Sequence, residues 1–440
     1  MAKKNYRQRT ETRPGNYFIS NYPPYSFWKP ELVGYALEAL YKPPRPGNPI
    51  GLYIHIPFCR KRCHFCYFKV YTRQRAAEIQ EYLDAVIAEL DLYLKYDFLG
   101  GRKPHFVYLG GGTPSYLSTK QFSSFVEKLQ KRLPWDCSQE ITIECEPGTL
   151  SEKKLKAMRR KGITRLSLGV ENLDEKILSI NGRAHGKREI QQSWRWIQAE
   201  GFPQVNVDLI AGMLEENDEN WKRCIESAVK MQPESVTVYQ MEIPFNTTIF
   251  QSMKEKGRRI APVADWPTKR RWVDYAFLEL EKSGYDIVSA YTAVRKGSKA
   301  SFVYRDALWR GADLLSIGVS SFGHINGTHF QNEQNLKQYM ERVQAGELPI
   351  YRAFSLSRKE LMIREFILQF KLGCIQPAYF EKKFGFDITL EFSKQLRELR
   401  QVGFLLSRGE EYILSRNALL QVDSLLPAFF LPQHRDSLYA

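Results

Sequence analysis

The chain has 440 residues, of which 43% are hydrophobic, and its 64 lysines and arginines against 49 aspartates and glutamates give a formal charge of +15. No apolar run approaches the roughly 20 residues of a membrane helix, and no apolar signal segment follows the basic N-terminus, so we expect a cytoplasmic protein. The basic runs are not interleaved with stacking aromatic residues, which disfavours a nucleic-acid partner, whereas a positive field suits an anionic small-molecule substrate.

In chain order, the first segment is rich in proline. Residues 1–48 contain "NYPPYSFWKPE" and "YKPPRPGNP", and such proline runs interrupt helices and central strands. We therefore expect an irregular N-terminal arm over residues 1–48. It would wrap around the main domain.

The next segment alternates between strand and helix patterns. Short apolar or alternating runs predict strands at 51–56, 105–110, 140–145, 164–170, 204–210, 235–242 and 285–290. Helical periodicity predicts helices at 77–97, 118–133, 151–161, 187–200 and 218–231. Ser118 with Gln121 forms a capping-box pattern, and Ser151 and Gly162 are placed to begin and end the third helix.

This alternation predicts an α/β fold. Six or more parallel strands covered by helices favour a full or partial (β/α) barrel over residues 49–335, with its active site at the C-terminal ends of the strands. From 336 to 440 the pattern changes to helices at 359–370, 376–385, 389–405 and 416–428, with one short strand at 410–415. We expect a small, mainly helical C-terminal domain, of winged-helix type.

Three of the seven cysteines lie within eight residues. Cys59, Cys63 and Cys66 have C-x3-C-x2-C spacing in a loop after the first predicted strand. In a reducing compartment, clustered thiols are better metal ligands than disulfides. A structural zinc would need a fourth ligand, such as His55 or His64, whereas an iron–sulfur cluster held by three cysteines leaves one iron open. The spacing favours the cluster.

The surrounding residues add a family resemblance. The triplet with "YIHIPFC" resembles radical S-adenosylmethionine (SAM) enzymes, in the subgroup of oxygen-independent coproporphyrinogen III oxidase and its haem-chaperone relatives (HemN/HemW type). The resemblance implies a [4Fe–4S] cluster whose open iron binds SAM, and reductive cleavage of SAM to a 5′-deoxyadenosyl radical that abstracts hydrogen. It also implies an electron donor of flavodoxin or ferredoxin type. The similarity covers about residues 50 to 430.

The same resemblance implies a set of SAM contacts. "YLGGGTPSYL" matches the glycine motif of the family, "ITIECEPGTL" its SAM-binding glutamate, and "SLGVENLDEKILSINGRAHG" a further SAM-binding stretch. The cofactor contacts implied in this way, for one or two SAM molecules, are Tyr53, Phe65, Gly111, Gly112, Thr113, Glu144, Glu171, Arg183, Asp208, Glu242 and Phe322.

Two departures from the oxidase pattern bear on the substrate. Phe68 stands where the oxidase has a further cysteine, and Glu171 stands where glutamine is usual, so a charged acceptor replaces an amide. Both leave the cluster intact. Candidate substrate contacts at the rim are Tyr239, Gln240, Tyr291, Arg305 and Arg310.

Four functions remain open at this point. The C-terminal similarity and the basic charge favour oxidative decarboxylation of a carboxylate-bearing, tetrapyrrole-type substrate. A HemN-like radical SAM methyltransferase that uses a second SAM is the alternative. A haem chaperone ranks third, because it would need an axial ligand such as His185, His324 or His329. An RNA-modifying radical SAM enzyme ranks fourth, because no RNA-binding domain is recognisable.

Overall fold

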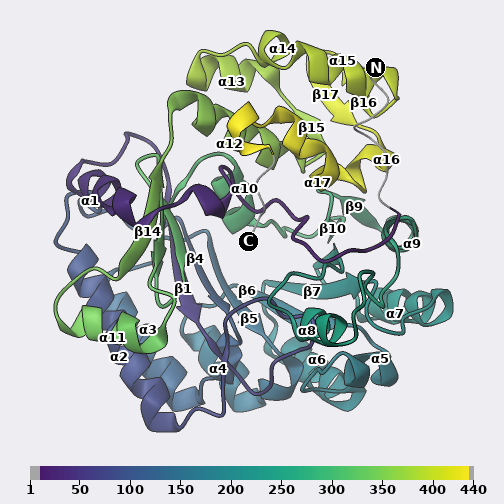
Figure 1. Ribbon diagram of the computed structural model, residues 1–440. Coiled ribbons are helices and arrows are strands. Elements are labelled where there is room, and N and C mark those ends of the chain that lie inside the picture. Colours follow the sequence, from purple (N-terminus) through teal and green to yellow (C-terminus); the bar gives the residue numbers. More distant parts are fainter. Residues whose placement is uncertain (1–9, 436–440) are drawn as a thin grey trace.

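The computed structural model of the protein describes residues 10–435, and its centre is one 12-stranded sheet (Figure 1). The strands of this sheet are β1 (Ile50–Ile56), β4 (Phe106–Gly111), β5 (Glu140–Cys145), β6 (Arg165–Glu171), β7 (Gln204–Ala211), β8 (Ser235–Gln240), β9 (Tyr285–Ile287), β10 (Thr292–Arg295), β11 (Asp313–Ile317), β12 (Phe322–Ile325), β13 (Thr328–Asn332) and β14 (Ile350–Ser355).

Seven neighbouring strands of the sheet run parallel. The order is β14-β13-β12-β11-β1-β4-β5-β6-β7-β8-β10-β9, and the pairs from β11 through β8 are all parallel. Antiparallel strands extend both ends, and the two edge strands do not pair with each other. The sheet is therefore an open, partial barrel, which confirms the predicted α/β class.

Helices connect the strands of the large sheet. They are α2 (Ala76–Tyr93), α3 (Thr119–Arg132), α4 (Glu152–Arg160), α5 (Glu175–Ile180), α6 (Lys187–Glu200), α7 (Asp218–Met231), α8 (Thr248–Glu255), α9 (Trp266–Lys282), α10 (Val303–Trp309) and α11 (Leu336–Gln344). Five of them, α2, α3, α4, α6 and α7, are those that the periodicity predicts. The Ser118 hydroxyl accepts from Gln121 N, and Ser151 caps α4, so the two predicted N-caps are confirmed. Gly162 follows α4 with a φ of 86°.

The N-terminal segment differs from the irregular arm that we expected. It contains helix α1 (Val33–Tyr41), whose Ala36, Ala39 and Leu40 are buried against the main core. The proline runs lie on either side of this helix, so they limit it without preventing it. Further toward the N-terminus, Gly15 donates its N–H to the carbonyl of Ile243, which fixes the segment beside the end of β8.

The C-terminal part is small and mainly helical, with a sheet that is larger than expected. Its elements are α12 (Arg358–Phe370), β15 (Cys374–Ile375), α13 (Pro377–Phe384), α14 (Ile388–Glu391), α15 (Ser393–Gln401), β16 (Leu405–Arg408), β17 (Glu411–Leu414), α16 (Arg416–Leu419) and α17 (Val422–Leu425). The strands form an antiparallel sheet in the order β15-β17-β16. In addition, α11 and β14 belong with the large sheet, beyond the domain limit of 335 that we expected.

Two of the predicted C-terminal helices are broken. The helix expected at 389–405 ends at residue 401 and is divided at Phe392, whose buried ring packs 4.6 Å from the ring of Phe366. The helix expected at 416–428 is replaced by α16, α17 and a 3-10 turn that begins beside Pro427. Proline lacks the N–H that would continue the helix. Over residues 10–435, no helix is long and apolar enough to cross a membrane.

A buried ion pair joins the N-terminal segment to the C-terminal part. The Lys371 side chain is fully buried, pairs with Asp423 at 2.8 Å and donates to the carbonyl of Ile19. Replacing Lys371 with methionine leaves Asp423 without its cation, and we expect the free energy of unfolding to fall by about 3–5 kcal/mol. Thermal unfolding measures this. Lys359→Met, which breaks a more exposed pair with Glu391, is the control and should cost at most about 1 kcal/mol.

Candidate active site

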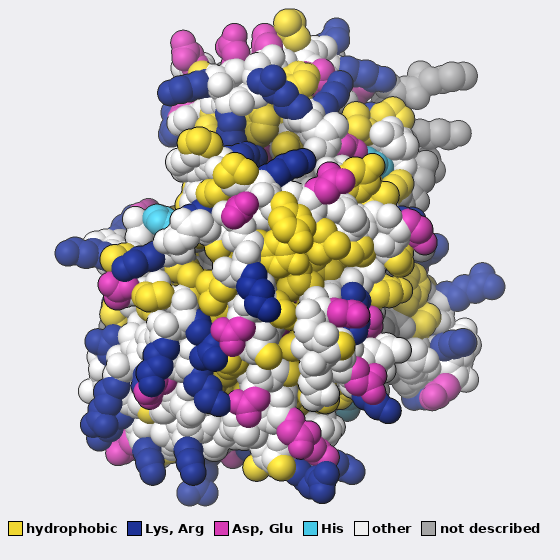
Figure 2. Space-filling model, turned by 90° about the vertical axis from the view of Figure 1, so that its left-hand side faces the viewer, with side chains coloured by type: hydrophobic (Ala, Val, Ile, Leu, Met, Phe, Trp, Pro, Cys, Tyr) yellow, Lys and Arg dark blue, Asp and Glu magenta, His cyan; other side chains and the backbone are white. Residues whose placement is uncertain are grey.

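One cavity of about 990 Å³ lies against the inner face of the large sheet, between the N-terminal segment and the C-terminal part. Side chains alternate between the two faces of a strand, so every second residue of β6 lines the cavity: Arg165, Ser167, Gly169 and Glu171. From the face shown in Figure 2, hydrophobic side chains gather in a hollow between the C-terminal part, at the top, and the rest of the molecule.

The structure brings the three clustered cysteines to the wall of this cavity. Their loop starts at β2 (Phe58–Cys59) and ends at β3 (Tyr71–Thr72), and the two short strands pair with each other. Within the loop, Cys66 N donates to the carbonyl of Cys63, and Arg62 donates to the carbonyl of Cys66. The loop is therefore closed at its base and braced inside.

The donor set fits an iron–sulfur cluster better than a single zinc ion. Within residues 10–435, no three His, Cys, Asp or Glu side chains are grouped closely enough to hold one metal ion. The two histidines that zinc would need have other partners: His55 Nδ1 lies 3.1 Å from the Tyr53 hydroxyl, and His64 Nδ1 lies 2.9 Å from the carbonyl of Ile180. An iron–sulfur cluster contains several iron atoms, so its cysteine ligands lie further apart than the ligands of a single zinc ion.

Two of the thiols already receive hydrogen bonds. Thr113 Oγ1 donates to Cys59 Sγ at 3.2 Å, and Arg183 Nη1 donates to Cys63 Sγ at 3.2 Å. Burial raises the pKa of Cys59 to about 12 and that of Cys66 to about 11, so free thiols are favoured until a metal displaces the protons. Hydrogen-bond donors of this kind stabilise the negative charge of a thiolate that binds a cluster.

The glycine motif allows close backbone approach beside the cysteine loop. Gly111 has a φ of 116°, which other residues rarely adopt. A Cβ on Gly112 would lie 2.9 Å from the carbonyl carbon of Pro57 and 3.0 Å from Cys59 Sγ. The motif thus holds β4 against the loop and leaves the cavity open.

Three half-buried carboxyl groups face the cavity from adjacent strands. Glu144 on β5 accepts from the Tyr108 hydroxyl at 2.8 Å and from Gly111 N at 3.0 Å. Asp208 on β7 accepts from Ser167 and Asn206. Burial raises the pKa of Glu144 to about 7 and that of Asp208 to about 6.

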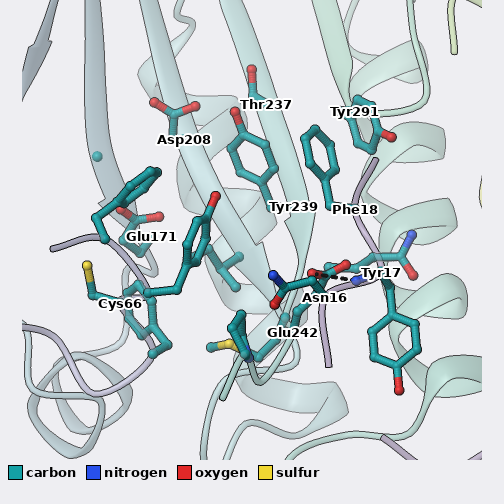
Figure 3. Close-up of a pocket in the computed structure, with 18 of the residues that line it drawn as sticks. Asn16, Tyr17, Phe18, Cys66, Glu171, Asp208, Thr237, Tyr239, Glu242 and Tyr291 are labelled. Carbon is teal, nitrogen blue, oxygen red and sulfur yellow. Dashed lines mark hydrogen bonds between the residues drawn. The ribbon is translucent and has the colours of Figure 1, made fainter. Parts of the chain in front are cut away.

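The third carboxyl group, on Glu171, ends β6. Its nearest cation is Arg183 at 3.6 Å, and burial raises its pKa to about 7. Figure 3 shows the Cys66 sulfur and the Glu171 carboxylate at one end of the pocket, with Tyr17 and Tyr291 at the other. Glu242 accepts a hydrogen bond from Tyr17 N at 3.0 Å, so it faces the N-terminal segment.

The structure places most of the expected cofactor contacts together. Those that line the cavity are Phe65, Gly111, Gly112, Thr113, Glu144, Glu171, Arg183, Asp208 and Glu242. Tyr53 and Phe322 do not line it. The Tyr53 hydroxyl is turned to His55, and the Phe322 ring lies 4.6 Å from that of Tyr25, which covers it from the N-terminal segment.

The rim residues that we expected to contact substrate divide in the same way. Tyr239, Gln240 and Tyr291 line the cavity, whereas Arg305 and Arg310 do not. The Arg305 side chain is buried and paired with Asp306 at 2.8 Å. Sequence reasoning missed Arg165, although its spacing of six residues from Glu171 along one strand already puts both on one face.

Comparisons with known proteins agree with this geometry. The radical SAM superfamily model matches residues 53–228, which include the cysteine loop, the glycine motif and the three cavity carboxyl groups. Residues 53–228 form a radical SAM domain. Such a domain implies a [4Fe–4S] cluster and SAM as cofactors, and the donor set described above fits both.

Relatives of this radical SAM protein fall into two functional groups. The oxygen-independent coproporphyrinogen III oxidase of Escherichia coli is 28% identical and covers 80% of this chain and 79% of its own. The haem chaperone HemW of Bacillus subtilis is 25% identical and covers 86% of this chain and 98% of its own. The solved structure of E. coli HemN superimposes with a TM-score of 0.80 at 23% identity, over 94% of this chain and 96% of that one. The protein is a radical SAM enzyme with the fold of HemN.

Proposed function

We propose that this radical SAM enzyme catalyses oxidative decarboxylation of propionate side chains on a coproporphyrinogen-type tetrapyrrole. The observation that carries the proposal is the cavity: at about 990 Å³ it joins the three thiols to a space large enough for a macrocycle. Its far end is aromatic, with Phe18 packed 5.2 Å from Tyr291 and Tyr239 stacked 6.4 Å from Tyr291. Aromatic walls suit the apolar pyrrole faces of such a macrocycle.

The residues around the cysteine loop would hold the cofactors. When bound, the cluster and SAM supply a radical that removes hydrogen from an unactivated C–H bond. Cys59, Cys63 and Cys66 would bind the iron, and the Glu144 and Asp208 carboxylates would accept from the ammonium and ribose hydroxyl groups of SAM. Gly111 and Gly112 have no side chain, so SAM could lie close to their backbone.

In the proposed reaction two of the propionates become vinyl groups, one after the other. A hydrogen atom leaves the carbon β to the carboxylate, the bond to the carboxyl carbon breaks to release CO₂, and the remaining electron passes to an acceptor. We propose a flavodoxin- or ferredoxin-type protein as the electron donor for the cluster. A cytoplasmic location would keep the three thiols reduced.

The haem chaperone is the second candidate, because the HemW relative matches over 98% of its length. The histidines that we considered as axial ligands argue against it. His324 and His329 lie with their Nδ1 atoms 3.0 Å apart, and both are buried outside the cavity lining. His185 is also buried and lies against the carbonyl of Val170.

Methyl transfer from a second SAM is the remaining alternative. The position of the oxidase's further cysteine is held by Phe68, which is 44% exposed and lies 4.3 Å from Tyr67 at the cavity wall. An RNA substrate would need a nucleic-acid surface, which the sequence does not indicate.

The proposal is tested by anaerobic incubation of the reconstituted enzyme with SAM, a reductant and coproporphyrinogen III. The expected products are a tetrapyrrole that has lost two carboxyl groups, CO₂ and 5′-deoxyadenosine. S-adenosylhomocysteine with a methylated product would instead establish the methyltransferase. An unchanged tetrapyrrole beside slow 5′-deoxyadenosine release would overturn the proposed substrate.

The affinity for SAM should depend on pH. Because the pKa of Glu144 is about 7 and that of Asp208 about 6, protonation below neutral pH removes the negative charge that a cationic ligand needs. We expect SAM to bind several-fold more weakly at pH 6 than at pH 8, and Glu144→Gln to bind it weakly at both. Anaerobic calorimetry at the two pH values measures this. Equal wild-type affinities at both values would contradict the assignment.

A further inference from the structure

A buried arginine lies at the start of β6, in the cavity wall. Arg165 is only 1% exposed, and its guanidinium carbon lies 4.1 Å from the centre of the Phe302 ring. Its Nε and Nη1 groups are buried and find no hydrogen-bond acceptor within residues 10–435. Because arginine remains charged at any physiological pH, this is a buried cation with unused donors.

The nearby carboxyl groups do not pair with Arg165. Its positive charge lowers the pKa of Glu144 and Asp208 and so opposes part of the increase caused by burial, but no ion pair with either carboxylate is formed. Glu144 is held by the Tyr108 hydroxyl and by Gly111 N, and Asp208 by Ser167 and Asn206. Both carboxylates therefore satisfy their hydrogen bonds without Arg165.

Two other arginines of the cavity already have partners for their terminal nitrogens. Arg183 contacts Glu171 and Cys63, and Arg62 donates to the carbonyls of Cys66 and Asn246. Leaving a buried charge without a partner is expensive, so a cavity that retains one is prepared for an anion. A carboxylate suits a guanidinium, since the two groups form parallel hydrogen bonds in one plane. The Phe302 ring holds that plane in place.

We infer that Arg165 binds a carboxylate group of the substrate, in the part of the cavity wall where β6 begins. Arg165 and Glu171 start and end β6, so their backbones lie about 20 Å apart along the strand. This inference rests on the proposed tetrapyrrole function and deepens it: a substrate with several carboxylates on one ring anchors one of them at Arg165 while another is turned toward the cysteine loop. Arg165 is then a specificity residue for polycarboxylates.

The test uses Arg165→Met, which removes the charge at similar length, and Arg165→Lys, which keeps the charge and loses the planar fork. Arg160→Met is the control, because Arg160 is an exposed residue of α4. One measurement follows fluorescence quenching of coproporphyrin III and of its tetramethyl ester. The other follows the unfolding temperature in glutarate at constant ionic strength. Should Arg165→Met fail to fold, Arg165→Lys carries both measurements.

We expect wild type and Arg160→Met to prefer the tetra-acid and to be stabilised by glutarate. Arg165→Met should bind the tetra-acid at least tenfold more weakly, bind the ester within twofold of wild type and lose the glutarate effect, with Arg165→Lys intermediate. If Arg165→Met still prefers coproporphyrin III to its tetramethyl ester, the inference is overturned and the proposed function stays intact. Glutarate stabilisation that depends on Arg165, without porphyrin binding, would keep the anion site and overturn the tetrapyrrole substrate.

Discussion

Replacing Cys63 with alanine is expected to abolish reductive cleavage of SAM. The change removes one of three thiols on the cavity wall and leaves Arg183 Nη1 without its sulfur partner. A cluster with only two protein ligands is not held, so iron content should fall to background together with 5′-deoxyadenosine formation. The measurements are iron and sulfide analysis, and product formation after anaerobic reconstitution.

Cys137→Ala is the matched control for this prediction. Cys137 is exposed and lies outside the cavity lining, so its variant should keep wild-type iron content and SAM cleavage. Cys59→Ala and Cys66→Ala should behave as Cys63→Ala does. SAM cleavage that survives in any of the three variants would contradict the assignment of these residues.

Substituting alanine for Gly112 is expected to have the second large effect. Its Cβ would stand 2.9 Å from the carbonyl carbon of Pro57 and 3.0 Å from Cys59 Sγ, so either the backbone of β4 or the cysteine loop has to move. Such a displacement is costly where backbone meets backbone, and we expect SAM affinity to fall at least tenfold. Equilibrium dialysis with labelled SAM measures this loss.

Gly34→Ala provides the comparison, because a Cβ on Gly34 in α1 meets nothing within 4 Å. That variant should bind SAM as the wild type does, and alanine should slightly favour the helix. If Gly112→Ala keeps wild-type SAM affinity, then close backbone approach at the glycine motif is not what forms the cofactor site.

Six of the seven parallel strands were predictable because their signals are local, whereas the parallel strand β11 and the antiparallel strands β10, β12, β13 and β14 were not predicted. The predicted strands are short apolar or alternating runs, and the caps at Ser118 and Ser151 depend on residues only three apart. The same reasoning failed where contacts between distant residues determine where a helix ends. Phe392 interrupts a helical pattern because its ring joins the cluster around Phe366 and Phe429, and no local signal reports that contact.

The candidate site shows the same division. The family resemblance was sufficient to single out Cys59, Glu144 and Asp208, which line one cavity because the C-terminal ends of parallel strands meet at one edge. The cover over Phe322 and the hydrogen bond from Tyr17 to Glu242 come from an N-terminal segment more than 200 residues away in sequence. Such contacts follow from the assembled fold.

The measurement that tests the account most directly is deuterium transfer from the substrate. Coproporphyrinogen III deuterated at the propionate carbons β to the carboxylates is incubated anaerobically with SAM, reductant and the reconstituted enzyme. If the enzyme abstracts hydrogen there, deuterium appears in the 5′-deoxyadenosine as carboxyl groups are lost. Unlabelled 5′-deoxyadenosine together with an intact tetrapyrrole would contradict the account.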